Sequence, residues 1–140
     1  STEILVYRLY NSNSNEHFFT TNSVEKDSLI VSGWNFEGIA WVAPHEGDAV
    51  YRYYNPNAGD HFYTMDKKEG DHLVSAGWRY EDIAFYSASQ DTGLPIYRVY
   101  NPNASSAGAH LFTLNSSERD VLVHLGWINE GIAYYALKIS

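Results

Sequence analysis

The chain has no cysteine among its 140 residues, and it carries little positive charge, with 9 lysines and arginines against 17 aspartates and glutamates. The missing cysteines exclude a disulfide-stabilised scaffold and thiol catalysis. The net charge of −8 would repel the phosphates of a nucleic acid or of an anionic membrane surface, so we expect no nucleic-acid partner. Since no apolar run approaches the roughly 18 residues of a transmembrane helix, we also expect no membrane insertion.

Aromatic side chains are abundant instead. They make up 16% of the residues, within an apolar fraction of 44% that excludes a disordered chain. A length of 140 residues is that of a single domain, 1–140. Aromatic residues in this number suit strands, interfaces and sugar-binding platforms alike, so the composition leaves these three roles open.

A threefold internal repeat organises this domain, and residues 51–86 are its middle copy. The copies follow one another at a period of 44 to 46 residues and cover about residues 4–44, 48–88 and 94–138. Units of this length are too small to bury a core alone, so we expect them to share one. The third copy departs most from the others, because its loop at residues 103–109 makes it three residues longer at this point.

Each copy predicts the order strand, strand, helix, strand. β-Branched and aromatic residues indicate first strands at 6–10, 50–54 and 96–100, second strands at 17–20, 61–64 and 110–113, and third strands around 39–42, 83–86 and 132–135. A cap residue followed three positions later by a structural glutamate predicts a capping box at each helix start, at Asn22 and Glu25, Asp66 and Glu69, and Asn115 and Glu118. Each helix is then expected to end at a glycine, at Gly33, Gly77 or Gly126.

Nine short strands and three short helices in three equal units predict a mainly β fold. We expect the strand-strand-helix-strand repeats to close with pseudo-threefold symmetry into a propeller-like arrangement, because closure lets each unit cover the edge of the next. A β-trefoil is the alternative, since it has the same symmetry and a similar repeat length, although it has four strands in each unit.

The polar residues that recur in all three copies have two alternative interpretations. These residues are Arg8, His17 and Glu37 with their equivalents Arg52, His61, Glu81, Arg98, His110 and Glu130. In a structural interpretation they satisfy one another while partly buried, because an unpaired buried polar group costs about 1–3 kcal/mol. In a functional interpretation they line a pocket beside an aromatic ring and bind a polar ligand.

Sugar recognition combines an aromatic face with a few hydrogen-bonding side chains, and each copy supplies this mixture. The candidate carbohydrate-binding residues are therefore Tyr10, Asn11, His17, Trp34 and Glu37, then Tyr54, Asn55, His61, Trp78 and Glu81, and finally Tyr100, Asn101, His110, Trp127 and Glu130. The three tryptophans have a competing role as packing residues in the core.

The sequence predicts no catalytic residue, no cofactor and no metal ligand set. No Gly-x-Ser-x-Gly motif occurs, and capping or pairing accounts for the repeated glutamates. One metal alternative stays open, in which the three repeat histidines converge on the threefold axis as a zinc site. The HxxE and HxH spacings that usually accompany such a site are missing.

A specific pattern runs from Val6 to Leu137: Tyr-Arg-x-Tyr-Asn-Pro, then His-Phe-Tyr-Thr, then Gly-Trp, then Glu-Gly-Ile-Ala-x-Tyr. It resembles the short repeat module of unassigned function that occurs in bacteria and some fungi, often appended to cell-wall hydrolases, peptidases and other surface proteins. The middle copy matches closely in YRYYNPNAGDHFYT and GWRYEDIAFY. The resemblance implies a non-catalytic accessory module that binds glycan or another surface ligand, here free-standing or excised from a longer protein.

We therefore expect a lectin-like carbohydrate-binding module, and not an enzyme, with up to three equivalent weak sites for glycans of a cell surface or cell wall. The competing function is that of a protein-binding or structural surface repeat. We expect a secreted or cell-surface location, although the first residues show no charged-then-apolar signal peptide.

Overall fold

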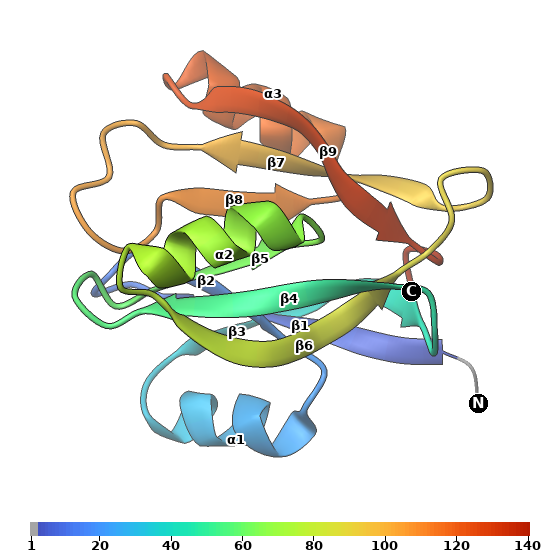
Figure 1. Cartoon of the computed structure of the whole chain (residues 1–140), viewed down its shortest axis with the longest axis horizontal. Helices are drawn as coiled ribbons and strands as arrows, with labels where there is room; N and C mark the ends of the chain where they lie inside the picture. The colour runs from blue at the N-terminus through green and yellow to red at the C-terminus, as the bar shows by residue number, and fades with distance from the viewer. Residues whose placement is uncertain (1–2) are drawn as a thin grey trace.

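Each repeat forms a three-stranded antiparallel sheet with one helix, as Figure 1 shows. The computed structural model describes residues 3–140. The first repeat contains β1 (Glu3–Asn11), β2 (Glu16–Thr20), α1 (Ser23–Val31) and β3 (Asn35–Pro44). The second contains β4 (Asp48–Asn55), β5 (Asp60–Thr64), α2 (Lys67–Ser75) and β6 (Arg79–Ser87), and the third contains β7 (Leu94–Tyr100), β8 (His110–Thr113), α3 (Ser116–His124) and β9 (Ile128–Ala136). The predicted order of elements and the mainly β character are confirmed.

The first strand of each repeat lies in the centre of its sheet. The strand orders are β2-β1-β3, β5-β4-β6 and β8-β7-β9, so the helix joins the two edge strands in every repeat. Figure 1 shows the three helices at three separate places on the outside of the molecule. Within residues 3–140, no helix is long and apolar enough to cross a membrane.

The helices begin and end at the residues that the sequence indicates. Asn22 accepts hydrogen bonds from two backbone N–H groups of the first turn of α1, at 2.9 and 3.1 Å, and the equivalent residues cap α2 and α3. After α1, Gly33 has a φ of +106°, a left-handed conformation that glycine adopts without strain. The Trp34 N–H then donates to the Leu29 carbonyl at 3.0 Å, which fixes where β3 begins.

Six aromatic rings, two from each repeat, fill the centre of the molecule. The second strands contribute Phe19, Tyr63 and Phe112, and the third strands contribute Trp41, Phe85 and Tyr134. Within each set of three, neighbouring ring centroids lie 5.4 to 6.4 Å apart. The two sets also contact each other within every repeat, at 5.4 to 6.3 Å. The core is therefore shared by the repeats, as their length predicts.

Two tyrosine hydroxyls in this core have opposite surroundings. The Tyr63 hydroxyl accepts a hydrogen bond from the Phe19 N–H at 2.9 Å and donates one to the Phe19 carbonyl at 3.3 Å, so it ties the second repeat to the backbone of the first. The Tyr134 hydroxyl is buried without a hydrogen-bond partner among the described residues. The second repeat has Phe85 in the place of Tyr134, which shows that the fold does not need this hydroxyl.

Backbone hydrogen bonds join the repeats outside their own sheets. The Val42 N–H donates to the Lys138 carbonyl at 3.0 Å, and the Leu137 N–H donates to the Val42 carbonyl at 2.8 Å, which connects the C-terminal segment to β3. The Ala88 N–H donates to the Tyr135 carbonyl at 2.9 Å and connects the second repeat to β9. The third repeat is thus bonded through its backbone to both of the others.

The shared core leads to a first prediction. A fragment of residues 1–43 contains only two of the six central rings, so we expect it to remain unfolded, whereas the full chain melts in a single transition. Circular dichroism during heating measures both. A cooperative melt of the isolated fragment would contradict the shared core.

Removing one hydroxyl group at two core positions should have opposite effects on stability. Tyr134→Phe removes a buried, unpaired hydroxyl and should raise the free energy of unfolding by about 1 kcal/mol, whereas Tyr63→Phe leaves the Phe19 N–H unpaired and should lower it by about 1–3 kcal/mol. Urea unfolding of both variants measures these changes. A loss of stability in Tyr134→Phe would show that its hydroxyl is satisfied.

Candidate functional site

A β-bulge in each sheet places a glutamate opposite the arginine of the central strand. Beside Arg8 the register between β1 and β3 shifts, so that two residues, Glu37 and Gly38, lie opposite one. Gly38 has a φ of +91°, and the equivalent residues in the other sheets, Asp82 and Gly131, also have positive φ, at +78° and +87°. The bulge therefore occurs in all three sheets, and it turns Glu37 and its equivalents toward the arginine.

Arg8 binds two glutamates that come from different repeats. Its Nε donates to Glu37 Oε1 at 2.7 Å, and its Nη1 and Nη2 donate to the two carboxylate oxygens of Glu118 at 2.9 and 2.8 Å. A planar guanidinium matches a carboxylate in this two-point geometry. Glu118 lies on α3, so this arginine joins the first repeat to the third.

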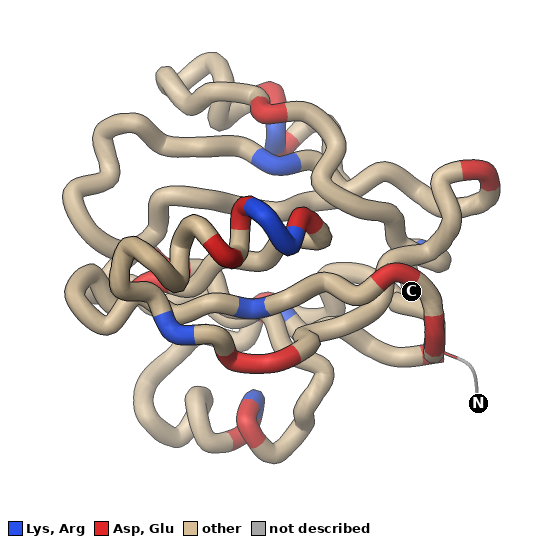
Figure 2. The backbone as a smooth tube through the Cα atoms, viewed as in Figure 1, with Lys and Arg blue, Asp and Glu red and all other residues tan. Residues whose placement is uncertain are grey.

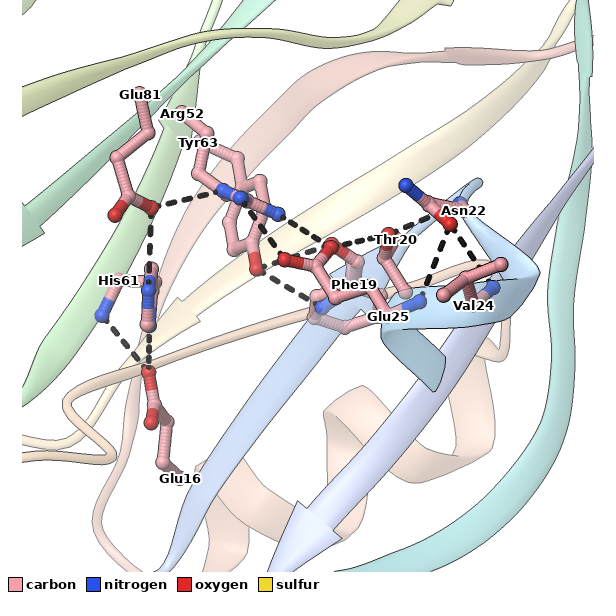
Figure 3. Close-up of polar contacts among 10 residues, drawn as sticks. All are labelled: Glu16, Phe19, Thr20, Asn22, Val24, Glu25, Arg52, His61, Tyr63 and Glu81. Carbon is pink, nitrogen blue, oxygen red and sulfur yellow. Dashed lines mark hydrogen bonds and ion pairs between the residues drawn. The ribbon is translucent and has the colours of Figure 1, made fainter. Parts of the chain in front are cut away.

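The other two arginines repeat this arrangement with the preceding repeat. Arg52 contacts Glu81 of its own repeat at 3.0 Å and Glu25 of the first repeat at 3.2 Å, and Figure 3 shows its guanidinium between these two carboxylates. Arg98 contacts Glu130 at 2.8 Å and Glu69 at 3.3 Å. Each of the three junctions between repeats therefore contains one shared arginine.

The predicted capping box is wrong in its second half. The cap residues do cap the helices, but Glu25 does not bond back to the N–H of Asn22. Instead the Asn22 N–H donates to Thr20 Oγ1 at 3.0 Å, and Thr20 donates to Glu25 Oε1 at 2.6 Å (Figure 3). The threonine replaces the glutamate at the cap because the glutamate carboxylate is used by Arg52 of the next repeat.

The repeat histidines lie beside their own tyrosines. The ring centroids of His17 and Tyr10 are 4.7 Å apart, and the other two pairs show 4.7 and 5.0 Å. The Nε2 atom of each histidine also faces the glutamate of the bulge, at 3.5 Å in the first repeat, 3.2 Å in the second and 3.1 Å in the third. Tyrosine, histidine, glutamate and arginine thus form one polar cluster in every repeat.

The clusters differ in what the preceding repeat adds to them. His61 Nδ1 lies 2.6 Å from Glu16 of the first repeat, a buried carboxylate that also accepts from the His61 N–H at 2.9 Å. At the next junction Asp60 takes the place of Glu16 and accepts from the Gly108 N–H at 3.1 Å. At the junction that faces His17, the equivalent residue is Ala109, which has no carboxylate. The three clusters are therefore not electrostatically equivalent.

The structure separates the predicted sugar-binding residues into three groups. The tyrosine, histidine and glutamate of each repeat come together as described. The asparagine lies in the hairpin turn, where Asn11 Oδ1 accepts from the Asn13 N–H at 2.9 Å, and Asn55 and Asn101 bond in the same way. Trp34 contacts Phe18 at 6.0 Å between ring centroids, and successive residues of a strand project to opposite faces, so Trp34 lies across the sheet from His17.

The histidines do not converge on a shared point. The six aromatic rings occupy the centre, and each histidine lies against its own tyrosine and glutamate. Among residues 3–140, no group of three or more histidine, cysteine, aspartate or glutamate side chains could hold a metal ion.

Hollows form where the repeats meet. A cavity of about 590 Å³ between the first and third repeats is lined by Arg8, Glu37, Ile39, Ala40, Thr113, Leu114, Asn115, Glu118 and Ile139. A second, of about 430 Å³, lies between the first and second repeats and contains Ile83 and Ala84 in the places of Ile39 and Ala40. A third, of about 320 Å³, is formed by asparagine- and serine-rich loops of the first and third repeats, including residues 103–108. We name the 590 Å³ cavity the 3–1 crevice.

The sequence pattern does not indicate the side chains that the third repeat contributes to the 3–1 crevice. Asn115 and Glu118 have the pattern of a helix start, which concealed their position at a junction between repeats. The repeat pattern does not indicate Glu16 and Asp60 either, because only two of the three copies have an acid there. A signal was nevertheless present, since an acidic residue next to a repeated histidine is unexpected in a strand that is otherwise aromatic.

Residues 5–137 match a family described as Domain of unknown function (DUF5648). The chain belongs to the DUF5648 family. The resemblance to a repeat module of unassigned function is confirmed to this extent, while the attachment of DUF5648 modules to cell-wall hydrolases stays a prediction. Comparisons with curated proteins and with solved structures found no match.

Burial and charge shift several pKa values in this DUF5648 chain. Burial, with a further contribution from Arg8, lowers the pKa of His17 to about 4. Burial raises the pKa of Asp60 to about 6, although hydrogen bonds from the Gly108 and His61 backbone act in the opposite direction. The hydrogen bonds from Arg8 lower the pKa of Glu118, against the effect of its burial. The junction carboxylate is therefore ionised at neutral pH, as its ion pair requires.

His17 and Asp60 should oppose each other in the pH dependence of stability. Between about pH 6.5 and 4 the unfolded state protonates His17 and the folded state does not, so acidification costs up to about 3 kcal/mol. Between about pH 6 and 3.8 the folded state protonates Asp60 first, so acidification gains a similar amount.

We expect His17→Gln to become more stable relative to the wild type as the pH falls from 6.5 to 4, and Asp60→Asn to become less stable over the same range. Urea unfolding at several pH values measures both slopes. Equal slopes in the two variants would contradict the assignment of these two residues.

Proposed function

We propose that this DUF5648 chain is a non-catalytic, lectin-like module that binds carbohydrate in the crevices between its repeats. The observation that carries the proposal is the composition of the 3–1 crevice, where a fixed guanidinium, two carboxylates and an amide lie beside aliphatic side chains. Carbohydrates present both hydroxyl groups and apolar C–H faces, so a site for them needs polar and apolar groups together.

Three groups in the crevice are available to sugar hydroxyls. Glu37 Oε1 is used by Arg8, but its second oxygen has no protein partner among the described residues. Asn115 uses its Oδ1 atom to cap α3, while its amide NH₂ has no partner in the same part of the chain. Arg8 is already held by three hydrogen bonds, so little conformational entropy is lost when a ligand contacts it.

The repeat provides a second crevice, although no arginine or glutamate among the described residues lines it. The crevice between the first and second repeats has the same Ile-Ala pair but contains Thr21 in the place of Leu114, together with His45 and Asp82. Together with the shared arginine at every junction, this supports a closed, propeller-like arrangement of three repeats with up to three similar, non-identical sites. We expect single-site dissociation constants in the high micromolar to millimolar range, about −4 to −6 kcal/mol.

The competing function, a protein-binding or structural surface repeat, is favoured by a different observation. Each repeat arginine and one of its two glutamate partners form a contact between repeats, and the other glutamate pairs with the arginine within its own repeat. Groups that are satisfied in this way contribute to stability without any ligand, so a test of sugar binding must leave them intact.

Asn115→Asp is a suitable test, because it keeps the cap and replaces the amide donor by a carboxylate oxygen, which only accepts hydrogen bonds. Asp66 already serves as the cap in the second repeat, so we expect the melting temperature to stay within a few degrees of the wild type. Loss of a hydrogen-bond donor in the crevice should weaken sugar binding by about tenfold. Saturation-transfer NMR with the best ligand from a broad glycan panel measures the affinity.

Asn22→Asp is the matched control, since it makes the same change at the helix cap of the first repeat, outside the 3–1 crevice. It should leave binding unchanged at that site. Absence of binding to every member of the panel would reject the lectin function and favour the protein-binding alternative. Equal weakening by the two variants would place the sugar elsewhere.

A further inference from the structure

A cation covers the tyrosine at the start of the first repeat's central strand. Lys26 Nζ lies 4.8 Å from the ring centroid of Tyr7 and 5.0 Å from that of Phe36, within the range of a cation–π contact. The same ammonium lies 3.3 Å from Asp27, the next residue of α1. Two rings and a carboxylate therefore hold one ammonium between the helix and the sheet.

The third repeat fills the equivalent place with an arginine. Arg119 Cζ lies 4.3 Å from the ring centroid of Tyr97, and its guanidinium contacts Asp120 at 2.8 Å. Asn129 takes the place of Phe36, so only one ring is present here. In the first and third repeats, therefore, the tyrosine and the aspartate at this position hold a cation.

The second repeat keeps the receptor and lacks the cation. Tyr51 and Asp71 are the equivalents of Tyr7 and Asp27, and Tyr80 stands in the place of Phe36, 6.1 Å from Tyr51 between ring centroids. The residue equivalent to Lys26 and Arg119 is Gly70, which has no side chain. A cavity of about 230 Å³ lies at this place, lined by Tyr51, Tyr53, Lys67, Asp71, Val74 and Tyr80. We name it the tyrosine cage.

Tyr53 explains why the second repeat has a glycine here. The first and third repeats have Leu9 and Val99 at this position, whereas Tyr53 extends under α2 so far that a Cβ atom on Gly70 would collide with its hydroxyl. Its ring centroid lies 5.4 Å from that of Tyr80. The ring of Tyr53 requires the glycine at position 70. Together these two residues convert a place that is filled in the other repeats into an aromatic cage.

We propose that the tyrosine cage binds a lysine side chain of a partner polypeptide, whose ammonium takes the place that Lys26 holds in the first repeat. The pair of rings formed by Tyr51 and Tyr80 corresponds to the pair that holds a lysine, and not to the single ring that holds Arg119. Tyr80 is 49% exposed, so the cage is accessible from solvent. The site is separate from the crevices between repeats and does not depend on the lectin function.

The charge of the molecule favours such a partner. The net charge is −8, and Figure 2 shows the basic positions scattered along the fold and not gathered at one place. Lys67, at the first position of α2, is the one ammonium that lines the cage, where the other repeats have Ser23 and Ser116. Within the described chain it makes neither an ion pair nor a cation–π contact, so the rings stay free for a ligand.

The test is an NMR titration of protein whose tyrosine residues are isotopically labelled. The ligand is lysine that is acetylated at the α-amine and amidated at the carboxyl group, and the signals of the tyrosine rings are followed. We expect saturable shifts of the Tyr51 and Tyr80 signals, and none with the analogue that is also acetylated at the ε-amine, because this analogue is neutral. The absence of shifts, or equal shifts with both compounds, would overturn the proposal.

Three variants make the test specific. Tyr53→Leu combined with Gly70→Lys reproduces the first repeat, so its own lysine should fill the cage and weaken binding by about tenfold or more. Lys26→Ala should open the equivalent place and add saturable shifts of the Tyr7 signal. Undiminished binding in the double variant, or no gain in Lys26→Ala, would contradict the proposed equivalence. Lys67→Ser should bind at least as tightly as the wild type, and binding confined to this variant would identify Lys67 as the natural occupant and overturn the proposal.

Discussion

The six aromatic rings at the centre of the molecule join three units that are each too small to fold alone. Burying one such ring contributes about 1.5–3 kcal/mol, whereas an exposed ion pair contributes about 0.2–1 kcal/mol. The shared core therefore outweighs the arginine–glutamate contacts, which lie at its edge and are partly exposed. These contacts set the register between repeats, because each guanidinium fits two carboxylates from different repeats in one geometry only.

Positions that have the same role in all three repeats maintain the fold, and two of them, Arg8 and Glu37, also line the 3–1 crevice, whereas positions that differ make each repeat distinct. The cap residue, the glycine after each helix and the shared arginine have the same role three times. In contrast, Glu16, Asp60 and Ala109 are equivalent and give each histidine a different charged neighbour. Gly70 likewise replaces a cation that the other two repeats keep. A threefold molecule therefore provides its own controls, because an unfilled place in one repeat can be compared with filled places in the others.

The two proposed sites use different chemistry on different parts of the molecule. The 3–1 crevice contains ionised groups held between repeats and aliphatic side chains, which suits a neutral ligand with many hydroxyls. The tyrosine cage lies within one repeat, under a helix, and suits an ammonium. A module with both properties would contact a glycan and a protein at the same time.

The sequence by itself determined the repeat, the order of elements, the helix caps and the need for a shared core, because these follow from local conformational preferences and from chain length. It did not determine which polar residues meet. Glu118 lies 110 residues from Arg8 in the chain, and the pattern of a helix start gave it a local role that a threonine performs instead. The tyrosine cage was equally hidden, because Gly70 is informative only when its place beside Tyr51 and Tyr53 is known. Contacts between repeats and packing under a helix depend on the tertiary arrangement, since the residues involved are distant in sequence and interact only after the core has formed.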